Sequence, residues 1–185
     1  MPHQGQKIVD KFSGDTIEFL ETAADTNGER ITIKWTLVSK GQTVDDHIHL
    51  LQNETFKVTA GRLTCIQNGE IVHVNAGEEI VLPKNTPHNH YNEDDQPAEY
   101  IQVIEPAYDL DYFAENLFGM INDGIVKEGK MPFFQAMITG QYLDSKTFLA
   151  AIPLKLQQTL AAILGPILRV FGYRALYKKY TDIEK

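Results

Sequence analysis

Two histidines and a glutamate constrain this chain more than any other feature. His47 and His49 are two residues apart, Glu54 follows five residues later, and Gly41 and Gly61 enclose the stretch. If the histidines lie on a strand, both imidazole rings point to the same face, because side chains alternate along a strand. Two neutral imidazoles and a carboxylate suit a divalent first-row metal that keeps open coordination positions. The stretch therefore predicts a metal site built on a β-sheet.

A second stretch supplies a fourth candidate ligand. His88 follows a turn marked by Pro83 and Asn85 and begins a run that reads as a strand, with Gly77 before it and Asn92 after it. Its imidazole completes a set of four protein ligands. On a six-coordinate metal this set would leave positions for substrate, water or dioxygen.

Together the two stretches resemble the pair of motifs that define the cupin family, over roughly residues 30–105. Every position of the first motif is present. In the second motif Asn85 stands where the family usually has glycine, but asparagine tolerates the left-handed conformation that such a turn position needs. The resemblance implies a metal, with iron, manganese, nickel and zinc as the candidates, and it implies a homodimer.

The alternative is a polar cluster that holds no metal. The four residues would be His47, His49, Glu54 and His88. Three imidazoles and a carboxylate are costly to bury without partners, whereas one metal ion satisfies all of them together. A divalent transition metal is therefore the expected cofactor.

The fold class follows from the strand pattern. Residues Ile31–Val38 alternate between apolar and polar, and Asn68-Gly69 is a strong hairpin signal. Many short strands at this spacing indicate a sandwich or barrel. The cupin resemblance selects a mainly β jelly-roll barrel, a double-stranded β-helix, for residues 1–106. Helical spacing then predicts an α-helical C-terminal extension over residues 107–185.

Within the extension, several short helices are expected. They cover residues 111–121, 132–139, 145–152, 154–164 and 166–180. Gly124 is expected to end the first of them. Gly165 breaks the last two apart, and Pro166 stands where a first helical turn accepts proline.

Charge separates the extension from the rest of the chain and argues against a nucleic-acid partner. The chain carries −8, whereas phosphate binding needs clustered lysine and arginine. Residues 151–185 hold six basic and two acidic residues, +4, so the remainder carries −12.

The apolar run at residues 160–168 is too short to span a membrane, which takes about 20 residues. We expect it to pack on the barrel or on a second subunit, with contact to a membrane surface as the alternative.

The chain is expected to be cytoplasmic. Its single cysteine, Cys65, rules out an internal disulfide, fits a reducing compartment and lies in an alternating strand as a predicted core thiol. The first ten residues lack the basic and apolar segments of a signal peptide.

Two functions remain open. One is a metal-dependent enzyme, dioxygenase- or isomerase-like, acting on a small organic molecule in the barrel. Glu54 would be its proton-accepting ligand, and His90, two residues beyond His88, either an acid or base or a structural group. The other is a non-catalytic barrel that binds or senses a small molecule, with a tail that mediates dimer or membrane-surface contact. An enzyme should bring an ionisable group such as His90, Glu79 or Tyr91 near the metal, and a binding module should have an apolar pocket.

Overall fold

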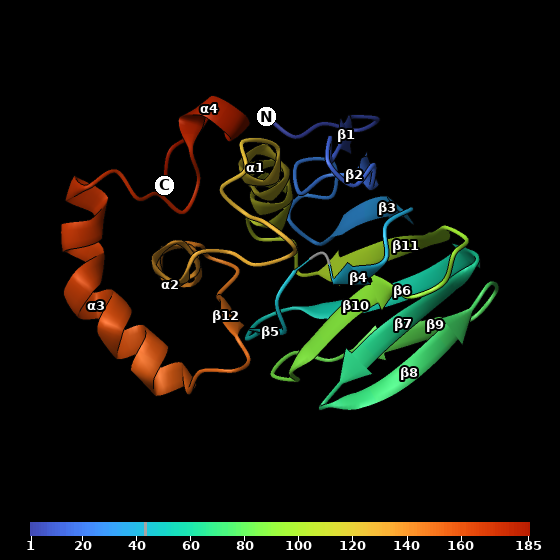
Figure 1. Ribbon diagram of the computed structural model, residues 1–185. Helices are drawn as coiled ribbons and strands as arrows, with labels where there is room; N and C mark the ends of the chain where they lie inside the picture. The colour runs from blue at the N-terminus through green and yellow to red at the C-terminus, as the bar shows by residue number, and fades with distance from the viewer. Residues whose placement is uncertain (43) are drawn as a thin grey trace.

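Two antiparallel β-sheets form the body of the protein (Figure 1). The computed structural model describes residues 1–42 and 44–185. The first sheet has the order β1 (Lys7–Val9), β2 (Thr16–Glu21), β3 (Ile31–Leu37), β11 (Ala98–Glu105), β6 (Asn53–Ala60) and β9 (Glu79–Leu82). The second has the order β12 (Thr147–Leu149), β5 (His47–His49), β10 (His88–Asn92), β7 (Arg62–Gln67) and β8 (Glu70–Asn75), and β4 (Gly41–Gln42) also pairs with β10. The predicted jelly-roll class is confirmed.

The hydrophobic core lies between the two sheets and draws residues from both. On β3 the predicted apolar face is buried, from Ile31 to Leu37. Cys65 on β7 is fully buried as expected, and burial, together with the charge of Glu54, raises the pKa of its thiol to about 12. This thiol therefore belongs to the core and stays protonated at neutral pH.

The turn residues adopt the conformations that their sequence predicts. Asn68 and Gly69 both have positive φ, 53° and 82°, and they join β7 to β8 as a two-residue hairpin loop. Asn85, at the motif position where glycine is usual, has φ 64°. Asparagine thus fulfils the backbone requirement of this turn.

After β11, the described chain forms four helices, with strand β12 between the second and the third. The helices are α1 (Leu110–Asn122), α2 (Phe133–Tyr142), α3 (Leu154–Val170) and α4 (Lys178–Thr181). Figure 1 shows α1 and α2 beside the barrel, with α3 at the outer edge of the molecule. The predicted first helix is present, and the α-helical character of the extension is confirmed. Among the described residues, no helix combines the length and apolar character needed to cross a membrane.

The helix predicted over residues 145–152 is wrong. The chain forms β12 there, which pairs with β5 through Thr147 opposite His49 and Leu149 opposite His47. Threonine and phenylalanine at positions 147 and 148 favour a strand. Pairing also covers an edge of β5 whose backbone groups would otherwise lack partners. The extension and the barrel therefore share a sheet.

The predicted break at Gly165 and the helix over residues 166–180 are also wrong. Helix α3 runs through Gly165 and Pro166 and ends at Val170. Gly165 lies where helix α3 packs on Tyr142, since a Cβ there would be 2.8 Å from the tyrosine hydroxyl. Gly172, with φ 91°, is a typical residue after a helix end and turns the chain away.

Candidate metal centre

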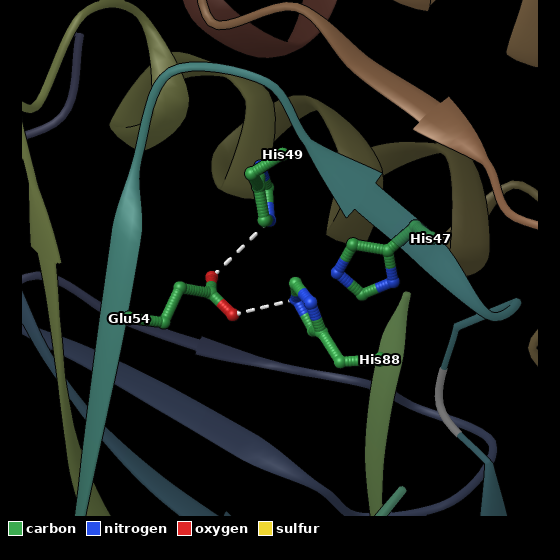
Figure 2. A group of neighbouring side chains, drawn as sticks. All are labelled: His47, His49, Glu54 and His88. Atoms are coloured by element: carbon green, nitrogen blue, oxygen red, sulfur yellow. Dashed lines mark ion pairs between the residues drawn. The ribbon is translucent and has the colours of Figure 1, made fainter. Parts of the chain in front are cut away.

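Three strands bring the four predicted ligands together (Figure 2). His47 and His49 lie on β5, and His88 lies opposite His47 on the neighbouring strand β10. Glu54 comes from β6 in the other sheet, so the carboxylate faces the imidazoles across the barrel interior. One ligand atom from each of these four residues lies within 4.8 Å of the others. The structure therefore assembles the whole predicted set.

Each imidazole ring is held through its Nδ1 atom by an oxygen outside the cluster. The contacts are His47 to the Asp45 carbonyl at 2.8 Å, His88 to the Thr86 carbonyl at 2.7 Å, and His49 to the Thr147 hydroxyl oxygen at 2.8 Å. Such contacts fix the ring orientation and favour the tautomer that leaves Nε2 free for a metal. The ring geometry is thus set by the protein itself.

Glu54 is positioned by a chain of hydrogen bonds that the sequence analysis did not find. Its carboxylate oxygens lie 3.3 Å from His49 Nε2 and 3.0 Å from His88 Nε2. Gln102 Nε2 donates to Glu54 Oε1 at 2.9 Å, and Trp35 Nε1 donates to Gln102 Oε1 at 2.6 Å. The indole therefore fixes the amide, and the amide fixes the carboxylate.

The electrostatics of the cluster fit a divalent metal. Burial acts to raise the pKa of Glu54, but His49 and His88 outweigh it and hold that pKa well below its usual range. Burial, with His88 and His49 nearby, also holds the pKa of His47 well below its usual value. In the described chain, neither Glu54 Oε2 nor His88 Nε2 has a partner in hydrogen-bond geometry. One metal ion would pair with these buried atoms, because carboxylates and imidazoles are ligands that divalent metals bind.

His90 lies inside the barrel but outside the cluster of four. Its buried ring packs on Phe56, Trp35 and Tyr100, with ring centroids 4.7, 5.9 and 5.5 Å away. Burial lowers its pKa to about 4. Neither of its ring nitrogens has a hydrogen-bond partner among the described residues. His90 is therefore a neutral, unpartnered group on the wall of the interior.

The other two ionisable groups that the sequence suggested lie elsewhere. Glu79 is exposed on β9 and pairs with Lys57 at 3.7 Å. Tyr91 alternates with its buried neighbours on β10 and does not line the cavity described next.

A cavity of about 120 Å³ opens from the cluster toward the helices. Its inner end presents His47, His49, Glu54 and His90, and Trp35 forms part of the wall. The extension supplies the opposite side, with Phe113, Leu117 and Phe118 from α1, Ala136 and Thr139 from α2, and Phe148 from β12. No lysine or arginine lies among the described residues that line it. The helical extension is therefore part of the site.

The contact between Thr147 and His49 links the extension to the cluster, and removing it tests whether the extension supports the site. Thr147→Val keeps the shape of the side chain and removes the oxygen 2.8 Å from His49 Nδ1. Metal affinity is expected to fall by roughly tenfold or more, the usual cost of losing such an outer contact, measured by competition with a chelator. Thr159→Val is the control, because that exposed hydroxyl bonds only to the Lys155 carbonyl within α3. Equal affinities in both variants would show that Thr147 does not support the site.

The sequence also matches a family model, the "Cupin domain", over residues 34–104. This segment contains all four clustered residues and lies in the confirmed jelly-roll fold. These findings support a cupin-family domain at residues 34–104, which is less than half of the chain.

Several characterised proteins are similar to this chain. Quercetin 2,3-dioxygenase of Bacillus subtilis (strain 168) is 28% identical over 105 residues, which are 56% of this chain and 30% of that protein. Among solved structures, a cupin-superfamily sugar phosphate isomerase from Silicibacter pomeroyi has a TM-score of 0.47 and 17% identity, covering 56% of this chain and 75% of its own. A variant of Streptomyces PAC13 with uridine has a TM-score of 0.46 and 16% identity, covering 57% and 78%. The chain spans less than a third of the dioxygenase, so its own site must indicate its activity.

Proposed function

We propose that the protein is a metal-dependent enzyme that acts on a small, uncharged and mostly apolar organic molecule. One observation carries the proposal. His47, His49 and Glu54, three of the four clustered residues, line a cavity that also presents His90, an ionisable group with no hydrogen-bond partner in the described chain. A cavity that joins a candidate metal set to a perturbed, unpartnered titratable group is typical of an active site.

The four clustered residues would hold the metal, and the protein supplies the remaining groups. A bound divalent metal supplies Lewis acidity toward a carbonyl, enol or hydroxyl oxygen, and a redox-active ion such as iron also supports dioxygen chemistry. Gln102 keeps the Glu54 carboxylate oriented through Oε1, and Oε2 lies 3.0 Å from His88 Nε2. His90 is neutral at pH 7 and can accept a hydrogen bond from a substrate in the cavity.

The cavity limits the size and charge of the substrate. Its volume of about 120 Å³ is below the ~150 Å³ of a cavity that admits benzene. A short branched chain fits, whereas a three-ring molecule such as quercetin does not fit this conformation. Asp45 and Glu54 lie in the described lining and no lysine or arginine does, so the protein lining offers no basic partner to an anionic group such as a phosphate, and a bound metal would have to supply the positive charge. Dioxygenase- and isomerase-like reactions both remain within this class.

A non-catalytic binding or sensing protein is the second candidate. The apolar wall formed by Phe113, Leu117 and Phe118 supports it, because such a wall binds a ligand without any chemistry. His90 favours the enzyme, since a purely binding barrel has no need of an unpartnered imidazole beside the metal.

Turnover by the metal-loaded wild type separates the two functions, and the His90→Gln variant tests the role of His90. The protein is first purified without chelator and its iron, manganese, nickel and zinc are measured by elemental analysis. Metal-loaded protein is then incubated with short-chain enolisable ketones, with oxygen uptake and product isomers followed by electrode and NMR. We expect wild-type turnover and, in His90→Gln, a fall in kcat of about 100-fold at an unchanged metal content.

Two results would go against this assignment. Tight binding of these compounds without turnover in the metal-loaded wild type would support the binding module. Undiminished turnover in His90→Gln would remove His90 from the chemistry while leaving the enzyme in place.

A further inference from the structure

The outer face of α3 carries an apolar stripe that no described part of the chain covers. We define the stripe as the exposed side chains of Leu156, Ile163, Ile167, Val170 and Phe171. Val170 and Phe171 are 85% and 76% exposed. Spacings of three, four and seven residues place Leu156 to Val170 along one side of the helix. Helix α3 is also the element at the outer edge of the molecule (Figure 1).

The opposite face of α3 already packs on the protein. Gln157, Ala161 and Gly165 are the buried residues of the helix. Gly165 meets Tyr142 of α2, and the Gln157 amide bonds to the Leu149 and Ile152 carbonyls. The fold therefore has a packing face on α3 without using the stripe. An exposed apolar face of this kind marks an interaction surface.

The chain around the stripe has one sign of charge. Residues 145–181 contain six lysines and arginines and no acidic residue, in a chain that has 25 acidic residues. Arg174 and Lys179 are paired with Glu184 and Asp123. Neither Lys155 nor Arg169 lies in an ion pair within the described residues; Lys155 is exposed, whereas the Arg169 guanidinium stacks over the Tyr142 ring, 4.6 Å from its centroid. The stripe is thus flanked by uncompensated positive charge.

We propose that α3 docks on an anionic lipid surface, with the stripe in the headgroup region and Lys155 toward the phosphates. An amphipathic helix with an apolar face and basic flanks lies in the plane of a membrane interface in this way. The site binds lipid headgroups independently of the metal centre, and it goes beyond the proposed enzyme activity.

A second copy of the chain fits this surface less well. An antiparallel pair of α3 helices centred on Ile163 would place Lys155 of one protomer beside Arg169 of its partner. Helix α3 has no acidic residue to separate these charges. Like charges at such a contact oppose pairing, whereas the negative surface of an anionic bilayer attracts them.

Vesicle sedimentation tests the proposal. Full-length protein is mixed with vesicles of phosphatidylcholine alone or of phosphatidylcholine with phosphatidylglycerol, at low and high salt. We expect binding to the anionic vesicles that weakens with salt, because charges near the surface are screened. Ile163→Ser is expected to weaken it by roughly tenfold and Lys155→Gln by roughly fivefold. Ile71→Ser is the matched control, an isoleucine of similar exposure on β8, and it should bind like the wild type.

Several outcomes would overturn the proposal. One is no binding of the wild type to either vesicle. Another is equal binding to both vesicles with no effect of salt, which would remove the anionic partner. In a third outcome, the wild-type protein does not bind vesicles, light scattering shows it to be a dimer, and Ile163→Ser is a monomer. The stripe would then be an interface between copies of the chain. Circular dichroism checks that each variant keeps the fold. The metal content of each variant should equal that of the wild type, because the proposed lipid site is independent of the metal centre.

Discussion

The His88→Ala variant is expected to bind a divalent transition metal at least about tenfold more weakly than the wild-type protein. The imidazole is almost fully buried, and its Nε2 lies 3.0 Å from Glu54 Oε2. Alanine removes one of the four converging donors and leaves the buried carboxylate with His49 as its remaining imidazole contact. Elemental analysis gives the metal per chain, and competition with a chelator gives the affinity.

His73→Ala is the matched control for this experiment. His73 lies exposed on β8 and approaches Glu93 at 3.4 Å, away from the cluster. It removes an imidazole without touching the four candidate ligands, so the metal affinity should stay at the wild-type value. If His88→Ala and His47→Ala both bind metal as tightly as this control, the cluster is not the metal site.

The position of the cluster was predictable because its residues obey local rules. Strand alternation places His47 and His49 on one side of β5. Turn chemistry at Asn85, where φ is 64°, brings the chain back so that His88 lies opposite His47. These are short-range relations that one sequence displays. They carried the four residues, whereas the barrel class was selected by the resemblance to the cupin motifs.

The contribution of the extension was not predictable for the opposite reason. Thr147 reaches His49 across 98 positions of sequence, and nothing near Thr147 indicates that partner. Its segment has apolar residues that suit either a helix or a strand, and the free edge of β5 selects the strand. Gln102 lies on an alternating strand without a local sign of its hydrogen bond to Glu54. Pairing between residues far apart in the sequence therefore determined the structure of this segment, which local spacing alone did not.

The extension changes how the site works, because it closes the cavity of the barrel. Residues of α1, α2 and β12 face the metal ligands across the cavity, and Phe118 of α1 packs in the same core as Trp35. Under the proposed function, the helices would select the substrate and the strands would carry the chemistry. Variation in the extension can change the substrate and leave the ligand set intact.

The Gly61→Ala variant is expected to lower the free energy of unfolding by about 3 kcal/mol, the sum of a left-handed backbone and a steric clash. Gly61 joins β6 to β7 with φ 68°, a conformation that costs a residue with a Cβ about 1–2 kcal/mol. A Cβ at this position would also collide with the backbone carbonyl oxygen of Pro97. That oxygen belongs to the main chain, so relief requires β6, which carries Glu54, to move relative to β11.

Gly77→Ala separates these two contributions, because it changes the same kind of residue without the clash. Gly77 has φ 90°, and nothing lies within 4 Å of the position a Cβ would take. Its unfolding free energy should fall by only about 1 kcal/mol, measured for both variants by urea denaturation with the slope compared to the wild type. Equal losses of unfolding free energy in the two variants would mean that the Pro97 carbonyl moves aside without a free-energy penalty. A larger loss at Gly61 would show that the glycine ending the first motif is required by the close approach of β6 and the chain before β11, as well as by its turn.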